Sequence, residues 1–495
     1  MLCRTFLYAL LALPLLADDG PCEKLAGLSL PDTTITQAQA IRTPPADAPA
    51  ALRNLPPFCR VAATLAPSKD SEIKIEVWLP ESNWNGKLQS LGNGGWSGAI
   101  NTGGLAGALR RGYATASTDT GHSGGGAAFA LGHPEKLTDF GYRAVHEMTV
   151  KAKAFIAAYY GNGPKLSYWN GCSSGGKQGL KEAQRFPADY DGIIAGAPAN
   201  YWTHLMVATL WPAHATLKDP AAFIPPSKYP LIHQAVLAAC DALDGVKDGV
   251  LENPTRCKFD PNLLLCKGDD TAGCLTAPQV EAARKIYGPV RNPRTRQEIF
   301  PLLEPGSELG WAPLAGGPAP FQIPVEHFKY VVFQDPNWDF KALNFDNDVA
   351  LADKIDNGLL NATDPDLKAF FARGGKLLQY HGWNDQIIAP RNSIDYYKSV
   401  EQKLGGPSKL QGNYRLFMVP GMGHCGGGDG PNSFDMVSTI EQWVEQNQPP
   451  ERIVATLRAN DSVVRTRPLC PFPQVAQYKG TGSTDDAASF VCKAP

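Results

Sequence analysis

The chain has 495 residues, of which 43% are hydrophobic and 19% are charged, and its formal net charge is −2. This length permits a large buried core and two domains of ordinary size, and the composition is that of a globular protein. The balanced charge, with no basic stripe and no block of like charge, gives no indication of a nucleic-acid or membrane-surface partner.

The N-terminus is typical of a secretory leader. Arg4 is followed by an apolar run over residues 6–16 and by Ala17, which precedes two aspartates. The run is too short to span a bilayer, and no later segment approaches ~18 uninterrupted apolar residues. We predict a signal peptide over residues 1–17 and a secreted or periplasmic mature chain. A buried N-terminal helix is the alternative.

After the leader, strand patterns alternate with helix patterns. Apolar runs predict strands at residues 72–79, 87–91, 113–117, 165–169 and 191–195, and helices are predicted at 140–160 and 177–185. The segments 376–380, 414–419 and 436–444 resume the alternation. This order predicts an α/β fold with a mainly parallel sheet that helices cover on both faces.

The alternation is lost between residues 198 and 376. This stretch carries four cysteines, many prolines and few strand patterns. Structureless stretches of this length are uncommon inside a compact domain. We predict a separate lid domain over 201–375, inserted into a catalytic domain made of 18–200 and 376–495. A set of long surface loops is the alternative.

A tight turn is expected between the strand at 165–169 and the helix at 177–185. There Gly171-Cys172-Ser173-Ser174-Gly175 matches the pattern G-x-S-x-G. A serine on a strained strand-to-helix turn exposes its hydroxyl, and the flanking glycines leave room for a substrate. Ser173 is therefore the candidate nucleophile. A glycine-rich turn without chemistry is the alternative.

A serine nucleophile needs an adjacent base, and that base needs a carboxylate to orient it. In this fold the chain order is serine, acid, histidine. Of the nine histidines, His381 and His424 lie directly after late predicted strands, and Asp385 comes four residues after His381. We assign Asp385 as the acid and His424 as the base. A histidine in such a loop is often only a capping or core residue.

Cysteines flank both candidates, since Cys172 precedes Ser173 and Cys425 follows His424. If Ser173 and His424 are within hydrogen-bonding reach, the Cα atoms of the two cysteines fall near the ~4.4–6.8 Å window of a disulfide. Removal of the leader leaves an even number of cysteines, which favours a disulfide framework in an exported chain. They are Cys22, Cys59, Cys172, Cys240, Cys257, Cys266, Cys274, Cys425, Cys470 and Cys492.

Stabilisation of an oxyanion needs two backbone N–H groups. Ser174 supplies one, as the residue after the nucleophile. The second is expected from the glycine-rich loop after the strand at 87–91, with Gly95 as the first choice and Gly94 as the fallback. A hairpin turn is the alternative for this loop, because Asn-Gly favours such turns.

Residues 241–250 (DALDGVKDGV) place three carboxylates at short intervals among turn-forming glycines. Such a loop can wrap a hard cation through oxygen ligands, although the spacing is not that of an EF-hand. By pattern alone, two Asp-Gly turns on the surface are an equally good interpretation. For a calcium ion we assign the side chains of Asp241, Asp244 and Asp248 and the carbonyls of Val246 and Val250.

Two further patterns carry less information. Residues 119–122 (DTGH) combine an acid with a histidine, but no second cluster matches them, so a loop near the active site is favoured over a metal centre. Asn361 and Asn460 fit N-glycosylation sequons, which matter only in a eukaryotic secretory pathway.

These motifs resemble those of the tannase and feruloyl esterase family of α/β-hydrolases, which also includes enzymes that cleave mono(2-hydroxyethyl) terephthalate. The resemblance spans nearly all of the mature chain, and the cysteines beside serine and histidine are its most specific mark. It rests on residues 171–176 (GCSSGG), 381–385 (HGWND), 423–425 (GHC), 241–250, 92–95 (GNGG), 117–122 (STDTGH) and 305–308 (PGSE).

The resemblance implies an α/β-hydrolase fold with a large inserted lid, a triad of Ser173, Asp385 and His424, and a Cys172–Cys425 disulfide. It also implies a structural calcium ion in the lid, with no organic cofactor. The implied activity is hydrolysis of small aromatic esters, such as feruloyl or coumaroyl esters derived from plant cell walls, through an acyl-enzyme.

Several alternatives remain for the function. Within the family, the chain would be a tannase acting on galloyl esters or a hydrolase of terephthalate monoesters. A peptidase on the same fold is a rival among the serine hydrolases. A binding protein that has lost catalysis is the rival from another class, and the presence of all three candidate triad residues disfavours it.

Overall fold

The computed structural model describes residues 20–43, 52–301 and 303–495. The predicted signal peptide, residues 1–17, lies outside the described residues. Within the described ranges, no helix is both long enough and apolar enough to cross a membrane.

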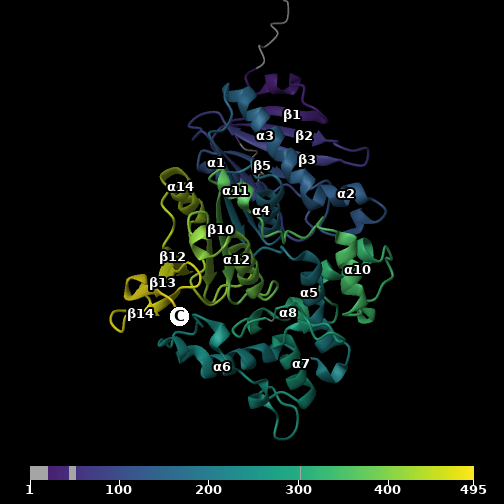
Figure 1. Ribbon diagram of the computed structural model, residues 1–495, viewed down its shortest axis with the longest axis vertical. Helices are drawn as coiled ribbons and strands as arrows, with labels where there is room; N and C mark the ends of the chain where they lie inside the picture. The colour runs from purple at the N-terminus through teal and green to yellow at the C-terminus, as the bar shows by residue number, and fades with distance from the viewer. Residues whose placement is uncertain (1–19, 44–51, 302) are drawn as a thin grey trace, which may run out of the picture.

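A nine-stranded sheet forms the centre of the molecule (Figure 1). In spatial order its strands are β1 (Thr33–Ile41), β2 (Phe58–Leu65), β3 (Ile73–Pro80), β5 (Ala114–Thr118), β4 (Lys87–Leu91), β6 (Leu166–Cys172), β7 (Gly192–Gly196), β10 (Lys376–Gly382) and β11 (Tyr414–Val419). Strands β1, β2, β3 and β5 pair antiparallel, whereas every pair from β5 to β11 is parallel. The predicted α/β class with a mainly parallel sheet is confirmed.

Burial explains which strands the sequence reveals. All residues of β7 and β11 are buried, as expected for parallel strands that helices cover on both faces, although β11 lies at the end of the strand order. Strand β1 has no fully buried residue, and it is rich in threonine and glutamine. The sequence analysis predicted neither β1 nor β2. For β1 the reason is that it is an edge strand, which depends on its pairing with β2 rather than on an apolar pattern.

The two faces of the sheet bury different helices. Leu377 and Leu378 are neighbours on β10, but their side chains belong to separate hydrophobic clusters, since successive strand residues point to opposite faces. One cluster includes α3 (Ala144–Tyr160), α4 (Ser174–Arg185) and α12 (Arg391–Leu404), and the other includes α1 (Thr102–Arg110) and α14 (Met436–Gln446). The helix predicted at 140–160 begins at Ala144, because residues 139–143 form a π-helical turn.

The chain between β7 and β10 forms a mostly helical insertion, of which the greater part lies below the sheet in Figure 1. Its hydrophobic core includes Trp202 and Trp311 and extends to Trp96 and Phe140 of the sheet-bearing part. A separate domain with the role of a lid stays a prediction. The insertion contains α5 (Trp202–Leu217), α6 (Tyr229–Cys240), α7 (Ala277–Tyr287), β8 (Val290–Arg291), β9 (Glu298–Phe300), α8 (Ala312–Ala315), α9 (Gln322–Glu326), α10 (Asn347–Asp356) and α11 (Lys368–Ala372).

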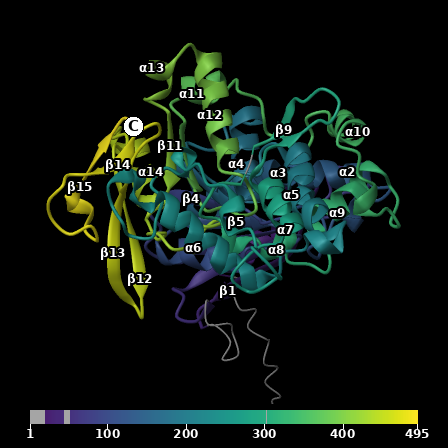
Figure 2. The ribbon, with the colours of Figure 1, turned by 90° about the horizontal axis from the view of Figure 1, so that it is seen from below.

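The C-terminal segment adds two hairpins that the sequence did not predict. They are β12 (Ile453–Ala459) with β13 (Ser462–Leu469), and β14 (Val475–Tyr478) with β15 (Phe490–Lys493). Figure 2 shows both at one side of the molecule, away from α2 (Pro134–Thr138) and α10. The short helix α13 (Pro407–Leu410) precedes β11.

All ten cysteines of the predicted framework form disulfides. The bonds are Cys22–Cys59, Cys172–Cys425, Cys240–Cys257, Cys266–Cys274 and Cys470–Cys492. The second of these joins residues 253 positions apart, whereas the others close short local loops. It is therefore the bond with the greatest consequence for the arrangement of the loops above the sheet.

Candidate active site

Ser173 lies on the turn between β6 and α4, with φ 64° and ψ −122°. A non-glycine residue with positive φ is strained, and the surrounding contacts hold it in place. A Cβ on Gly171 would lie 2.5 Å from the carbonyl oxygen of Gly175, and a Cβ on Gly92 would lie 2.6 Å from the Gly175 Cα. The turn therefore needs glycine at these positions, because β6, α4 and the loop after β4 meet there backbone to backbone.

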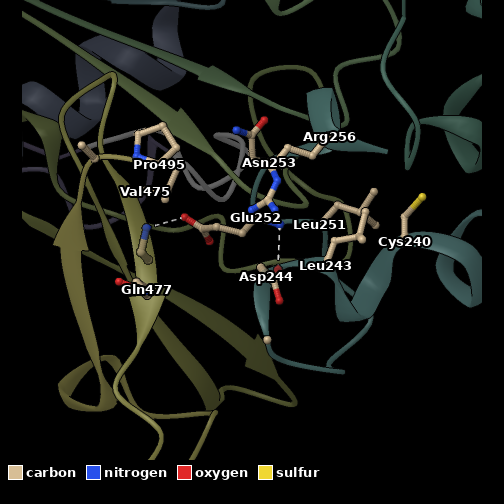
Figure 3. Close-up of a pocket in the computed structure, with 13 residues that line it drawn as sticks. Cys240, Leu243, Asp244, Leu251, Glu252, Asn253, Arg256, Val475, Gln477 and Pro495 are labelled. Atoms are coloured by element: carbon tan, nitrogen blue, oxygen red, sulfur yellow. Dashed lines mark hydrogen bonds between the residues drawn. The ribbon is translucent and has the colours of Figure 1, made fainter. Parts of the chain in front are cut away.

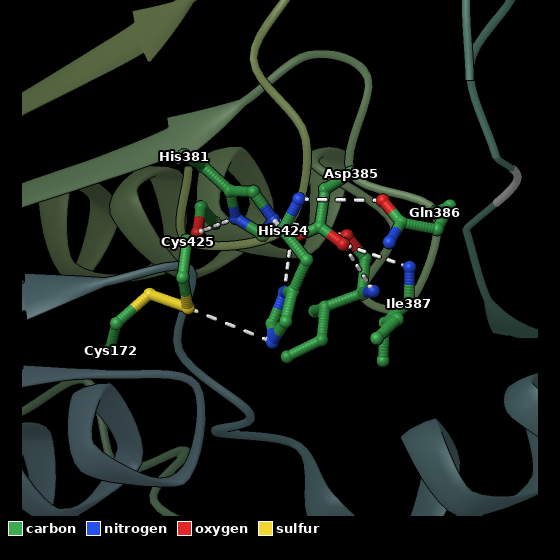
Figure 4. The surroundings of a disulfide bond; sticks show 9 residues. Cys172, His381, Asp385, Gln386, Ile387, His424 and Cys425 are labelled. Atoms are coloured by element: carbon green, nitrogen blue, oxygen red, sulfur yellow. Dashed lines mark hydrogen bonds and ion pairs between the residues drawn. A yellow bond between two sulfur atoms is a disulfide. The ribbon is translucent and has the colours of Figure 1, made fainter. Parts of the chain in front are cut away.

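Asp385 and His424 lie in the loops that follow β10 and β11, and these strands are neighbours in the sheet. His424 Nδ1 lies 2.7 Å from Asp385 Oδ2, as Figure 4 shows. The other carboxylate oxygen of Asp385 accepts hydrogen bonds from the backbone N–H groups of Ile387 and Ile388, both at 2.8 Å. The structure therefore joins the candidate acid to the candidate base and fixes the carboxylate from two sides.

The electrostatics of this pair follow from its burial and its charges. Burial by itself would raise the pKa of Asp385, but His424 and His381 outweigh it and hold that pKa well below its usual range. Burial also opposes the charged form of His424, yet the carboxylate of Asp385 raises the pKa of the imidazole above its ordinary value. The carboxyl group of Asp385 therefore stays ionised, and its negative charge favours the protonated form of His424.

His381 has a different place from His424. Its side chain is fully buried, with Nδ1 2.7 Å from Ser393 Oγ and Nε2 3.1 Å from Asp385 Oδ2. It supports the carboxylate from behind, whereas His424 is partly exposed on the other side. The sequence analysis did not predict this contact, although the spacing of four residues between His381 and Asp385 could have indicated it.

The Cys172–Cys425 disulfide ties the two loops together, with its Cα atoms 6.0 Å apart. It joins the residue before Ser173 to the residue after His424, as the flanking cysteines led us to expect. The ring nitrogens of His424 contact Asp385 and, at 3.7 Å, Cys425 Sγ, and among the described residues no hydrogen bond joins them to the Ser173 hydroxyl. In enzymes without substrate, the hydrogen bond between a catalytic serine and its histidine is often long, and it tightens when the substrate binds.

The loop after β4 lies against the start of α4. The Ser174 hydroxyl donates to the carbonyl oxygen of Gly95 at 2.9 Å, so the two candidate oxyanion residues are neighbours. The N–H of Asn93 donates to Gln178 Oε1 at 3.1 Å, which anchors the loop to α4. The sequence did not single out Gln178, since its partner lies 85 positions away.

Residues 119–122 support the same loop from the other side. His122 Nε2 lies 2.8 Å from the carbonyl oxygen of Trp96, and the His122 ring stacks on Phe129. This placement agrees with the interpretation of 119–122 as a loop beside the site, and the ring serves the backbone rather than a metal.

The acidic loop at 241–250 and the residues that follow it contact the C-terminal hairpins (Figure 3). Its carboxylates accept backbone hydrogen bonds, from Gly249 to Asp241 and from Val246 to Asp244. Asp248 pairs with Arg467 of β13. Neighbouring Glu252, which the sequence analysis did not include, is buried and accepts a hydrogen bond from the N–H of Ala476 at 2.7 Å.

The residues of this loop fit a hard divalent cation by their donor chemistry. Four carboxyl groups, those of Asp241, Asp244, Asp248 and Glu252, lie near only two arginines, Arg465 and Arg467, so carboxyl groups are in excess. Burial raises the pKa of Asp244 and raises that of Glu252 to about 8. In the described chain, the three aspartate side chains do not form a cluster with all ligand atoms within 4.8 Å of one another. Asp248 is engaged by Arg467 in this arrangement.

We predict that a double variant, Cys172→Ser with Cys425→Ser, loses about 10²-fold in the kcat for hydrolysis of a simple activated ester. The reason is that a misplacement of about 1 Å between reacting groups has a cost of this size. The measurement is initial rates on folded protein, with the fold checked by circular dichroism. The matched control is Cys266→Ser with Cys274→Ser, which removes a disulfide in the insertion. Equal losses in the two double variants would contradict a specific role for the Cys172–Cys425 bond.

Comparisons with known proteins point to one family. The family model for tannase and feruloyl esterase matches residues 59–493. An uncharacterized esterase of Xanthomonas campestris pv. campestris is 42% identical, with 95% of this chain and 91% of that protein covered. A probable feruloyl esterase B-1 of Aspergillus flavus is 36% identical, with 88% of this chain and 86% of that protein covered.

A solved structure is similar as well. Feruloyl esterase B from Aspergillus oryzae superposes with a TM-score of 0.91 at 31% identity, and the superposition covers 96% of this chain and 99% of that chain. Both the sequence and the fold thus match over nearly the full length of the relatives. The chain belongs to the tannase and feruloyl esterase family of α/β-hydrolases and is a carboxylic ester hydrolase.

Proposed function

We propose that the chain is a secreted serine esterase that hydrolyses esters of aromatic acids, in the manner of a feruloyl esterase, through an acyl-enzyme. The observation that carries this proposal is the 2.7 Å contact between His424 and Asp385 in a loop that a disulfide ties to the strained turn of Ser173. Support for the aromatic acyl group comes from the relatives that are named feruloyl esterases. Support for secretion comes from the five disulfides, which persist in oxidising compartments.

In the proposed mechanism, Ser173 Oγ attacks the ester carbonyl while His424 Nε2 accepts its proton. His424 Nδ1 donates to Asp385, which holds the ring in the tautomer that leaves Nε2 free to accept. The oxyanion is stabilised by the N–H of Ser174, which has no partner inside its helix because it begins α4, and by the N–H of Gly95.

Protonated His424 then gives its proton to the leaving alcohol, and the acyl group stays on Ser173. Water takes the place of the alcohol, gives a proton to His424 and attacks the acyl-enzyme, which releases the acid and restores the hydroxyl of Ser173.

The aromatic residues Trp202 and Trp311 are fully buried in the core of the insertion, so packing is their first role.

The first test is covalent labelling together with a substrate panel. We expect a fluorophosphonate to label wild-type protein and not Ser173→Ala, and we expect Ser174→Ala, which keeps the backbone N–H, to be labelled. Hydrolysis of methyl ferulate is expected to exceed that of methyl gallate and of a terephthalate monoester, with no cleavage of peptide anilides. A faster reaction with gallate or terephthalate would favour the corresponding alternative, and absence of label at Ser173 would refute the serine mechanism.

The pH dependence follows from the raised pKa of His424. The base is active when neutral, so kcat/KM is expected to fall as the pH drops through a value above the ordinary 6.5 of histidine. In Asp385→Asn the anion that raises this pKa is gone. The His424 imidazole, followed by NMR, should then titrate at lower pH, and kcat should fall by roughly 10⁴-fold. Glu81→Gln, on the surface, is the control, and an unchanged imidazole titration in Asp385→Asn would contradict the pairing.

We further propose that the loop at 241–250 holds a structural calcium ion through Asp241, Asp244, Asp248 and the carbonyls of Val246 and Val250. A bound calcium ion would neutralise part of the excess of carboxylates and hold the turns of the loop together. The support for this proposal is the all-oxygen donor set and its surplus of carboxyl groups over arginines.

Removal of calcium by a chelator is expected to lower the melting temperature of the protein, and readdition of calcium is expected to restore it. Stabilisation reaches about 2.7 kcal/mol when free calcium is at 100 times its Kd. Asp244→Asn should lose this response, whereas Asp269→Asn, an exposed aspartate outside the loop, should keep it. A melting temperature that does not respond to calcium in fully stripped wild-type protein would rule out the stabilising ion.

A further inference from the structure

Three side chains with metal-binding atoms meet on one face of the sheet. His146 comes from α3, Glu182 from α4, and Asp189 from the segment that leads into β7. One ligand atom of each lies within 4.8 Å of the ligand atoms of the other two. Helices α3 and α4 pack against each other over the same hydrophobic cluster (Figure 1). Glu182 lies about 12 Å along α4 from Ser174, so this cluster is separate from the candidate triad.

The carboxyl group of Glu182 is buried and has no hydrogen-bond partner. The residue is 1% exposed, and neither of its carboxylate oxygens forms a hydrogen bond with any described residue. A buried polar group without a partner is costly to the folded state. Burial and the negative charge of Asp189 raise the pKa of Glu182 well above its ordinary value, and Lys153 offsets them only in part. The cluster therefore has capacity for one more positively charged group.

His146 and Asp189 form the outer side of the cluster. His146 Nδ1 lies 2.6 Å from Asp189 Oδ2, and the imidazole stacks on the ring of Phe186, which fixes its plane. The side chains of His146 and Asp189 are 28% and 12% exposed, so an ion has a path from solvent to the buried Glu182. Lys153 Nζ donates to the backbone carbonyl oxygen of Asp189 at 2.6 Å, so its ammonium group is bound to the main chain.

The spacing and the donor types suit a zinc ion. In a tetrahedral site with bonds of about 2.0–2.1 Å, the ligand atoms lie ~3.3 Å from one another. The contact between His146 and Asp189 is shorter than this, and no pair is farther apart than 4.8 Å, so rotations of the side chains suffice to surround one ion. An imidazole nitrogen favours zinc over magnesium and calcium, which prefer oxygen ligands. Three protein ligands leave a fourth position for water on the exposed side.

A proton is the competing occupant of this cluster. A proton shared between Glu182 and Asp189 would also relieve the repulsion between the two carboxyl groups. In that case the cluster would have no specific affinity for a metal ion. The two occupants are therefore distinguished by direct measurement of metal binding.

We propose that His146, Glu182 and Asp189 bind a structural zinc ion that joins α3, α4 and the segment before β7. The ion supplies the positive charge that the buried carboxyl group of Glu182 lacks. It also fixes the end of α4 opposite Ser173. The site differs from the acidic loop at 241–250, whose donors are all oxygen atoms.

The test is a calorimetric titration of the full-length protein with zinc chloride, after chelator treatment and with excess calcium present to saturate the acidic loop. We expect the wild type to bind one equivalent of zinc that Glu182→Gln binds at least about 100-fold more weakly. This substitution keeps the shape of the side chain, and loss of a ligand should cost no less than the 10–100-fold effect of losing a residue that only orients one. Cobalt chloride, whose visible absorption reports its coordination, should give a four-coordinate spectrum in the wild type and not in Glu182→Gln.

Two further variants make the result specific. His146→Ala removes a partly exposed ligand from the other helix and should weaken zinc binding to a similar extent. Glu147→Gln is the matched control, because its carboxylate is directed to Lys151 on the same helix and lies outside the cluster. Zinc should raise the melting temperature of the wild type and of Glu147→Gln, and it should not raise that of Glu182→Gln or His146→Ala.

The outcomes decide the occupant. Equal zinc affinity in the wild type, Glu182→Gln and His146→Ala would place any bound zinc elsewhere and overturn the site. A wild type that binds no zinc would leave the shared proton as the occupant and refute the proposal. Magnesium chloride that binds at these residues as tightly as zinc would overturn the choice of metal. None of these measurements depends on Ser173, so the result is independent of the proposed esterase function.

Discussion

The close backbone contact of β6, α4 and the loop after β4 is the constraint on which the rest of the site depends. Three chain segments meet at Gly92, Gly171 and Gly175, with no space for a Cβ atom at the first two and little at the third. This approach holds Ser173 in its positive-φ conformation and puts Gly95 beside Ser174. A nucleophile and an oxyanion site can therefore be arranged by backbone spacing alone, before any catalytic side chain is considered.

The second requirement is a buried carboxylate whose hydrogen bonds are all made. Asp385 is removed from water, which is costly for a charge unless partners compensate it. Two backbone N–H groups and His381 supply this compensation, and His424 completes it from the exposed side. Since the carboxylate cannot move within this network, it fixes the orientation of the His424 ring.

The insertion is joined to the sheet-bearing part at places far from each other in the sequence. Arg467 of β13 pairs with Asp248, and the buried Glu252 accepts the N–H of Ala476 on β14. On the other side, His233 of α6 approaches Asp429 in the loop after His424. The C-terminal hairpins thus contact the acidic loop, and α6 approaches the loop that follows His424, so the two parts of the chain meet at two separate places.

The sequence by itself determined the elements whose residues carry their own signal. Strands β4 and β11 have the predicted bounds, and β11 is the mostly apolar run expected of a buried parallel strand, whereas β4 is marked by the turn before it and the glycine-rich loop after it. The turn at Ser173, the order of the candidate acid and base, and the cysteines beside them were also local patterns. The polar edge strand β1 and the C-terminal hairpins carried no such signal and were missed.

Only the tertiary structure decided which of two similar histidines is exposed at the site. His381 and His424 both follow late strands, and packing against Ser393 and Ile388 buries the first. The contacts of Glu252 and Arg467, and the approach of His233 to Asp429, are likewise not indicated by any local pattern. Each joins segments tens to hundreds of positions apart, and such pairings depend on how complete elements pack rather than on the preferences of neighbouring residues.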